Sequence, residues 1–365
     1  MKKQRLLVLL AAALCLGACS DINVEEPPAS SQVAEESVIS EETAEEGESL
    51  WISEEESAFT AESSEPTAEE SSEEPVEEST PPQVTESSSA PEINVNAAEI
   101  CAAIAAIKES GFTTDIDDPE AQEKLKELQE YLEGTTYGFF YCDLEFTRYI
   151  AYGTNKQFHT ASTSKLPYIK HLAERVDAGE IDLSEQLVQL AEYHDPGSGI
   201  LKNNTPGGSY SVATLMDYVL RYSDNIAYKM LIQRFGLAEF KEGLKNIGVS
   251  FETYNGYGNC TASEMAAMLF DVATYKGGCL ELIQNAACNA SYNWQFGAEL
   301  SEYKVMQKYG VIKPSNLMYH DIAVVYAPKP YLIVMYTNIN YDSADKNVPF
   351  RKVGRLVEEI DALLR

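Results

Sequence analysis

The chain has 365 residues, with 58 acidic and 27 basic side chains and a formal net charge of −31. Residues 20–95 hold 23 of the acidic side chains and no lysine or arginine, so residues 96–365 retain 35 acidic and 24 basic residues. Because nucleic acids are bound through basic surfaces, this balance excludes a typical DNA- or RNA-binding protein. Glycine motifs that bind phosphates or dinucleotides are also missing from the sequence.

Residues 1–18 have the pattern of a signal peptide, because a basic start is followed by an apolar run over residues 6–16. The run is too short to span a membrane. It ends in Leu-Gly-Ala-Cys, which resembles a bacterial lipobox and implies cleavage before Cys19 and lipidation of its thiol. We therefore expect an extracytoplasmic protein, anchored by a lipid on Cys19 to the outer face of the bacterial cell membrane. A plain secretory signal is the alternative.

Residues 19–95 are dominated by Glu, Ser, Thr, Pro and Ala. Their low hydrophobicity and high negative charge predict a disordered segment, in which Trp51 and Phe59 are too isolated to form a core. We interpret the segment as a tether without a specific partner, which leaves residues 96–365 as the folded domain.

Five cysteines lie beyond the predicted lipid acceptor, and they are Cys101, Cys142, Cys260, Cys279 and Cys288. An odd number leaves at least one free thiol. The four histidines are scattered and form no zinc-binding motif, so we expect neither a metal site nor another cofactor.

Hydrophobic periodicity predicts a series of elements in the folded domain. Helices are expected over Asp118–Leu132, Leu166–Ala178, Val212–Tyr222, Ile226–Phe235, Leu237–Ile247, Ala262–Tyr275, Leu280–Ala287 and Phe350–Leu364. Strands are expected over Thr135–Asp143, Arg148–Gly153, Tyr303–Tyr309, Ile322–Tyr326 and Leu332–Thr337. Strands at both ends with helices between them indicate an α+β fold, in which N- and C-terminal strands share one antiparallel sheet beside a mostly helical subdomain.

The sequence Ser-Thr-Ser-Lys at residues 162–165 precedes a predicted helix. A serine at a helix start lies near free backbone N–H groups that can stabilise an oxyanion. Lys165 lies on the same helical face as Ser162, so its amine can reach the hydroxyl and act as the base that a serine nucleophile needs. By itself the pattern also fits an N-cap serine followed by a solvated lysine.

Two further motifs change this interpretation. Ser-Asp-Asn at residues 223–225 lies between two predicted helices, and Lys-Tyr-Gly at residues 308–310 ends a predicted strand. S-x-x-K, S-D-N and K-T-G form the set used by class A β-lactamases and penicillin-binding proteins. The chain therefore resembles the class A β-lactamase-like serine hydrolases over about residues 118–365.

The resemblance implies roles for three catalytic residues. Ser162 would attack the substrate carbonyl and become acylated, and Lys165 would accept the hydroxyl proton. Ser223 would relay a proton to the leaving nitrogen. These residue types suit acyl transfer, which needs a nucleophile, a base and a proton relay.

The resemblance also implies substrate-binding positions. Asn225 would hold a substrate amide and Lys165, and Lys308 would attract the substrate carboxylate. Gly310 and Val311 follow on the same strand, and the N–H groups of Ser162 and Val311 would form the oxyanion hole. Asp224 would brace its loop.

The sequence departs from the family pattern at two places. Tyr309 stands where the family has a small hydroxyl residue. The segment over residues 247–260 is too short for the loop that carries the family's deacylating glutamate, and we interpret its Glu252 as an exposed loop acid. We therefore expect deacylation to be slow.

Two other segments have open interpretations. Gly197-Ser198-Gly199 either lines the rim of the cleft together with Tyr193 or is a plain turn. For His320 and Asp321 we prefer a structural role over a catalytic dyad, because adjacent residues of a strand point to opposite faces.

The first hypothesis is a monomeric serine acyl hydrolase that opens β-lactams through an acyl-serine intermediate. The alternatives are a D-Ala-D-Ala peptidase acting on peptidoglycan stem peptides, and a non-catalytic module of the same fold that binds β-lactams or the cell wall.

Overall fold

The computed structural model describes residues 97–312 and 318–365. The predicted signal peptide, the lipid acceptor Cys19 and the acidic tether lie outside the described residues. Among the helices of the described part, none is long and apolar enough to cross a membrane.

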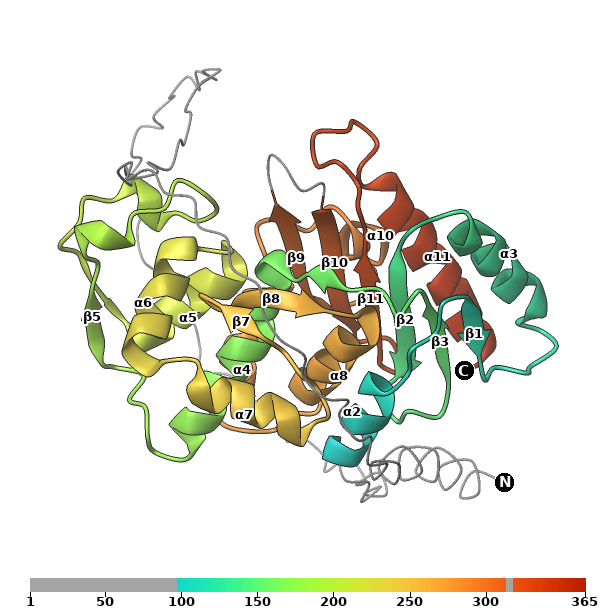
Figure 1. The fold of residues 1–365 in the computed structure, drawn as a ribbon, viewed down its shortest axis with the longest axis horizontal. Coiled ribbons are helices and arrows are strands. Elements are labelled where there is room, and N and C mark those ends of the chain that lie inside the picture. Colours follow the sequence, from blue (N-terminus) through green and yellow to red (C-terminus); the bar gives the residue numbers. More distant parts are fainter. Residues whose placement is uncertain (1–96, 313–317) are drawn as a thin grey trace, which may run out of the picture. The chain divides into compact units, whose positions relative to one another are not determined.

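A six-stranded sheet forms the centre of the domain, with the strand order β1-β3-β2-β11-β10-β9 and antiparallel pairing throughout (Figure 1). Its strands are β1 Phe112–Thr114, β2 Gly138–Asp143, β3 Tyr149–Tyr152, β9 Val305–Ile312, β10 Met318–Val325 and β11 Tyr331–Tyr336. The early hairpin β2–β3 pairs with the late strand β11, which confirms the predicted α+β fold with one sheet shared by both ends of the domain.

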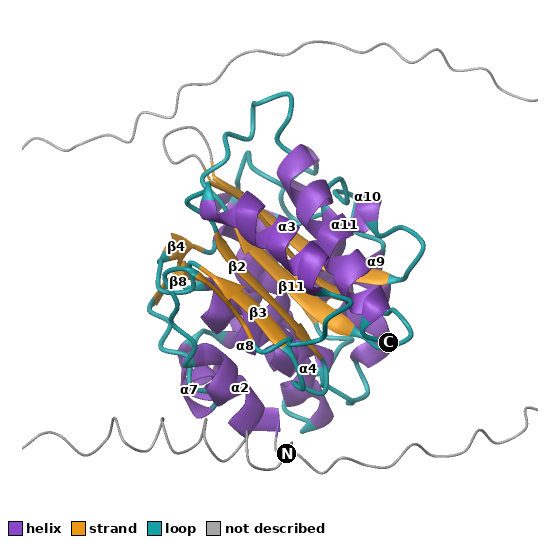
Figure 2. Ribbon diagram, turned by 90° about the vertical axis from the view of Figure 1, so that its right-hand side faces the viewer, coloured by secondary structure: helices purple, strands orange, loops and turns teal. Residues whose placement is uncertain are grey.

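Ten α-helices lie in the described part of the chain. Their bounds are α2 Ala97–Ala105, α3 Gln122–Glu133, α4 Lys165–Asp177, α5 Val212–Arg221, α6 Asn225–Phe235, α7 Ala238–Asn246, α8 Ala262–Ala273, α9 Leu280–Cys288, α10 Phe296–Glu299 and α11 Val348–Leu363. Helices α3 and α11 pack against each other over one face of the sheet (Figure 2), and α8 packs against the strands from the other face.

Side-chain alternation along the strands builds two hydrophobic cores. In β2, Phe139 and Tyr141 belong to the core beneath α3 and α11, whereas Phe140 and Cys142 belong to the core shared with the helical subdomain. Every residue of β2 is buried, because helices cover both faces. The sheet is therefore a rigid wall from which the edge strand β9 can present side chains to a site.

Several elements were not predicted from the sequence. They are α2, β1, the short strands β4 Phe158–His159, β7 Thr253–Tyr254 and β8 Tyr257–Cys260, the pair β5 Gln186–Val188 and β6 Ser209–Ser211, the 3₁₀ helices η1 Ala161–Ser164, η2 Ala191–Tyr193 and η3 Leu201–Asn203, and α10. The paired strands among them are two to four residues long, and all but β7, which forms a tight hairpin with β8, pair with partners at least 20 residues away, so local periodicity carries little signal for them.

The five cysteines of the described residues are all free thiols. Four are buried, and Cys288 is partly exposed. The sequence predicted at least one free thiol, which agrees with this finding.

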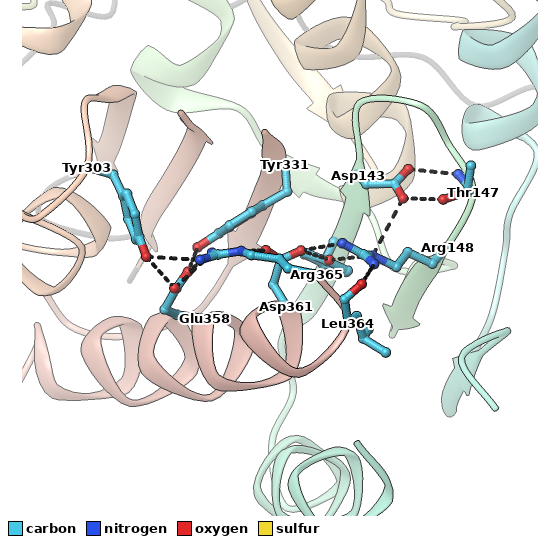
Figure 3. A network of polar contacts seen from close by, with 10 residues as sticks. Asp143, Thr147, Arg148, Tyr303, Tyr331, Glu358, Asp361, Leu364 and Arg365 are labelled. Carbon is cyan, nitrogen blue, oxygen red and sulfur yellow. Dashed lines mark hydrogen bonds and ion pairs between the residues drawn. The ribbon is translucent and has the colours of Figure 1, made fainter. Parts of the chain in front are cut away.

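A network of charged and hydroxyl groups fastens α11 to the sheet (Figure 3). The carboxylate of Asp361 is fully buried and accepts hydrogen bonds from Tyr141 Oη at 2.7 Å and Arg148 Nη2 at 2.7 Å. Its other oxygen accepts from Arg365 Nε at 2.9 Å. One turn earlier, Glu358 accepts from the hydroxyl of Tyr331 on β11. Helix α11 is thus held to both β2 and β11 by polar contacts as well as by its apolar face.

We expect Asp361→Ala to lower the free energy of unfolding by about 3–5 kcal/mol, because it leaves buried donors without their acceptor. Urea denaturation of the folded domain measures this loss. Lys126→Ala is the matched control, since its ion pair with Glu130 is solvent-exposed and should contribute far less. Equal losses in the two variants would show that the network does not stabilise the domain.

Candidate active site

Ser162 lies in the 3₁₀ turn η1, immediately before Lys165 begins α4. Its exposed fraction is 9%, so it is almost buried but reaches the surface. The preceding Ala161 has a φ of +46°, a left-handed conformation that residues other than glycine rarely adopt, and its N–H donates to His159 Nδ1 at 3.0 Å. Such backbone strain is concentrated at functional sites, and here it lies beside the predicted nucleophile.

The side chain of Lys165 is fully buried beside the Ser-Asp-Asn turn. Its Nζ donates to Ser223 O at 2.7 Å and to Asn225 Oδ1 at 2.6 Å, and it lies 3.4 Å from Ser223 Oγ. Burial lowers the pKa of Lys165 to about 7, although the nearby carboxylates of Asp224 and Asp195 act in the opposite direction. Lys165 is therefore not the solvated lysine of the alternative interpretation, but an amine that can lose its proton near neutral pH.

The Ser-Asp-Asn turn joins α5 to α6, as predicted. Ser223 has a φ of +53° and is fully buried, and its hydroxyl accepts a hydrogen bond from Lys308 Nζ at 2.9 Å. The Ser223 hydroxyl thus lies between two amines, that of Lys165 from α4 and that of Lys308 from β9.

Asp224 braces the turn, as the sequence predicted. One carboxylate oxygen caps α6 by accepting from the N–H groups of Ile226 and Ala227, both at 2.9 Å. The other accepts from the N–H groups of Ile200 at 2.7 Å and Leu201 at 2.8 Å. The carboxylate therefore fixes the preceding loop against the turn and has no free oxygen for a ligand.

Asn225 has both ends of its amide occupied. Its Oδ1 accepts from Lys165, and its Nδ2 donates to Asp195 Oδ1 at 2.9 Å. Asp195 in turn pairs with Lys229 Nζ at 2.9 Å. Sequence analysis did not find Asp195, because its contact joins a loop to the start of α6, 30 residues away, and leaves no local pattern.

Lys308, Gly310 and Val311 lie within the edge strand β9, not at its end as predicted, because pairing with β10 continues to Ile312. The Nζ of Lys308 donates to Ser223 Oγ and to Tyr309 O at 3.1 Å. Burial and the neighbouring amine of Lys165 hold the pKa of Lys308 well below its ordinary value.

Gly310 lies directly against the Ser162 turn. A Cβ atom at this position would come within 3.0 Å of Thr160 O and 3.1 Å of the side chains of Ala161 and Thr163. The absence of a side chain lets β9 approach the turn closely, and Val311 follows, half-buried, as the next residue on the strand.

The loop over residues 195–201 packs against the Ser-Asp-Asn turn, and Tyr193 and Asp195 line a groove beside it, whereas residues 197–199 are not part of that lining. Ser198 O accepts the N–H of Asn225 at 2.9 Å. Gly199 has a φ of +122°, and a Cβ there would lie 2.3 Å from the carboxyl group of Asp224. Glycine is thus required where this loop contacts the Ser-Asp-Asn turn.

Residues 253–260 form the hairpin β7–β8, whose second strand pairs with β4 next to the Ser162 turn. The side chain of Glu252 is 96% exposed, and its carboxylate lies 4.0 Å from Lys241 Nζ. This exposure agrees with the interpretation of Glu252 as a loop acid.

A groove of about 820 Å³ lies between this hairpin, α6 and the loop at residues 192–195. We call it the side groove. Its lining includes Tyr193, Asp195 and Lys229 on one side and Tyr254 and Tyr257 on the other. The hydroxyl of Tyr257 lies 3.5 Å from Asn225 Oδ1, so one wall of the side groove contacts the partly buried amide of the site.

His320 and Asp321 serve the structure and point in different directions, as predicted. His320 Nδ1 accepts from Thr337 N at 3.1 Å, so its Nε2 carries the proton and donates to His159 O at 3.0 Å. Burial lowers the pKa of His320 to about 3. Asp321 accepts from the N–H of Phe296 at 3.2 Å. Neither side chain forms a dyad with the other.

The structure thus brings the predicted residues Lys165, Ser223, Asn225 and Lys308 into one hydrogen-bonded cluster next to the turn that carries Ser162. Two amines, a hydroxyl and an amide at the mouth of a groove are suited to moving protons at an acyl group. Among the described residues there is no group of three or more His, Cys, Asp or Glu that could hold a metal ion.

The fold matches solved structures of serine β-lactamases and related proteins. A variant of PBP-A, solved as an acyl-enzyme complex with penicillin G, is 20% identical with a TM-score of 0.60, covering 66% of this chain and 97% of that one. A β-lactamase from Xanthomonas campestris is 22% identical with a TM-score of 0.58, covering 66% and 98%. An ancestral class A β-lactamase is 23% identical with a TM-score of 0.57, covering 66% and 99%.

A search of curated proteins finds no match for this chain. The model of the Beta-lactamase enzyme family, in contrast, matches residues 120–360, which include every motif of the site. The chain therefore belongs to the Beta-lactamase enzyme family and has the fold of its class A members and of PBP-A.

Proposed function

We propose that the protein is a serine acyl hydrolase that opens β-lactams through an acyl-Ser162 intermediate. The observation that carries this proposal is the chain of contacts from Lys165 through Ser223 to Lys308 beside the Ser162 turn. It supplies a buried amine on the helix that follows the Ser162 turn and a hydroxyl held between two amines. Acylation of a serine by an unreactive amide needs such a base and such a proton relay.

In the proposed acylation, Ser162 Oγ bonds to the lactam carbonyl carbon while the C–N bond breaks. Neutral Lys165 takes the hydroxyl proton, and Ser223 passes a proton to the departing nitrogen. The N–H groups of Ser162 and Val311 would stabilise the oxyanion. Gly310 supports this arrangement, since it lets β9 approach the turn. Asn225 would contribute chiefly by orienting Lys165.

Deacylation is the slower half of the proposed reaction. It needs a base that activates water, and the acid of the shortened loop, Glu252, points into solvent. Lys165 or solvent alone would then have to assist the water. A slow second step separates this proposal from an efficient β-lactamase.

A peptidase acting on D-Ala-D-Ala stem peptides is the second candidate, and the side groove favours it. The groove of about 820 Å³ starts at the contact of Tyr257 with Asn225 and continues along α6, which offers room for an extended peptide. The chemistry at Ser162 would be the same, so the two candidates differ in the acyl donor.

Intact-mass spectrometry of the folded domain with benzylpenicillin tests the proposed nucleophile and base. We expect one covalent adduct on the parent protein and none on Ser162→Ala. Lys165→Ala should slow adduct formation by about 10²–10⁴-fold. The double variant should likewise form no adduct, because the base has no effect once the nucleophile is absent.

Lys245→Ala provides the control for this experiment, because its side chain is solvent-exposed and pairs with Glu242 on the surface of α7. It should form the adduct at the parent rate. Adduct formation at the parent rate by Lys165→Ala would show that Lys165 is not the base.

The pH dependence of acylation tests the protonation state of Lys165. Since the base must be neutral and its pKa is about 7, the rate should rise between pH 5.5 and 8 with a midpoint near 7. Asp195→Asn removes a carboxylate that stabilises the protonated amine, so its midpoint should move to lower pH. A midpoint that moves upward would contradict this electrostatic account, and a flat profile would remove Lys165 as the titrating base.

Hydrolysis of a chromogenic cephalosporin tests the slow second step. We expect a burst of about one equivalent of product, followed by a low steady rate. Glu252→Gln should leave both phases as they are, because the carboxylate is solvent-exposed at the edge of the side groove and is not a buried base. Fast turnover without a burst, abolished by Glu252→Gln, would show that this loop supplies the deacylating base.

A further inference from the structure

Tyr309, the residue that departs from the family motif, bridges the two walls of the site. Its hydroxyl lies 3.4 Å from Ser198 Oγ on the loop at residues 195–201. Its ring packs on that of Tyr292, with 4.9 Å between the ring centroids. The exposed fraction of Tyr309 is 5%, so this phenol is an enclosed part of the site.

The same ring covers Lys308. The Nζ of Lys308 lies 4.3 Å from the centroid of the Tyr309 ring, within the range of a cation–π contact. An ammonium group has three donors, and two of those of Lys308 are used by Ser223 Oγ and Tyr309 O. Both of these acceptors are neutral oxygens, so the hydrogen bonds of Lys308 within the described residues do not compensate its positive charge. The Tyr309 ring covers Lys308 on the side where the ammonium group could otherwise bind an anionic group of a ligand.

The side groove lies away from Lys308. The side groove is lined by the β7–β8 hairpin, α6 and the loop at residues 192–195, and no residue of β9 takes part in it. The side groove therefore approaches the cluster from the Asn225 end, through its lining residue Tyr257, whereas the ring of Tyr309 covers Lys308 at the other end.

We propose that Tyr309 is a specificity-determining residue that closes the anion-binding half of the site over Lys308. Acyl donors recognised through the side groove, without a carboxylate next to the scissile bond, would react with Ser162 readily. Donors that carry such a carboxylate, including penicillins, would react only when the ring moves away from Lys308 and the contact with Ser198 breaks. This inference rests on the proposed function of Ser162 as nucleophile.

The test compares two reagents on the folded domain. Benzylpenicillin carries a carboxylate next to its lactam nitrogen, whereas an alkyl fluorophosphonate carries none and reacts when Ser162 Oγ bonds to phosphorus and fluoride leaves. The second-order rate constant is measured with each reagent by intact mass, and the ratio of penicillin to fluorophosphonate is compared among variants. The ratio cancels changes in the reactivity of Ser162 that are common to both reagents.

We expect Tyr309→Thr to raise this ratio at least tenfold, because it removes the ring and opens Lys308. Tyr309→Phe and Ser198→Ala each remove only the hydroxyl contact, so each should raise the ratio by a few fold, and the double variant should not exceed the larger single effect. Tyr131→Thr is the matched control, since Tyr131 lies on α3 across the sheet from Ser162. Its ratio should equal that of the parent.

A ratio of penicillin to fluorophosphonate reactivity that is unchanged or lowered in Tyr309→Thr would overturn the inference. A lowered ratio would show that Tyr309 helps to bind the carboxylate of penicillin. Failure of the proposed function has a different signature. In that case the fluorophosphonate would not label Ser162 in the parent or in any Tyr309 variant, whichever residues flank the site.

Discussion

The burial of two amines around one serine hydroxyl is the constraint on which this site depends. Lys165 and Lys308 are both buried, and within the described part of the chain their hydrogen bonds go to neutral oxygens. Burial of an ammonium group disfavours its charge, and the amine of Lys165 also lowers the pKa of Lys308. The cluster therefore holds its protons weakly, which is the property that a proton-transfer site requires.

The fold supplies the support for this unfavourable arrangement. Lys165 comes from α4, Ser223 from the turn between α5 and α6, and Lys308 from β9, so the helical subdomain and the sheet must both be in place. The left-handed conformation of Ser223 is maintained by the next residue, Asp224, which accepts four backbone N–H groups. The stability of the sheet and its helices thus compensates for strain and desolvation at the site.

Most helices and strands and most residues of the candidate site could be predicted from the sequence, because periodic elements and ordered motifs carry local signals. The hairpin β2–β3, the late strands and eight of the helices were predicted with boundary differences of a few residues. The order of the three motifs located Lys165, Ser223, Asn225 and Lys308, which the structure joins by hydrogen bonds.

The remaining features arise from contacts between distant segments. The strands β4 and β8 are two and four residues long and exist because they pair across about 100 residues of sequence. Helix α2 is rich in alanine and directly follows the acidic segment, so its apolar face had no clear period. Asn225 contacts Asp195, and the hydroxyl of Tyr309 contacts Ser198. Both contacts depend on how the loop at residues 195–201 packs against the rest of the site, which a sequence pattern does not encode.

The hydrogen bonds within the site also determine whether it stabilises a neutral bound ligand or the charged transition state. The amide of Asn225 is occupied at both ends, Ser223 accepts from Lys308, and Tyr309 reaches Ser198. A neutral ligand would exchange these internal contacts for similar ones and gain little. Negative charge that develops on a carbonyl oxygen as Ser162 attacks is different, because it meets backbone donors and two buried amines whose hydrogen bonds within the described residues go to neutral oxygens. The interaction is then stronger in the transition state than with the bound substrate, and only such differential binding accelerates the chemical step.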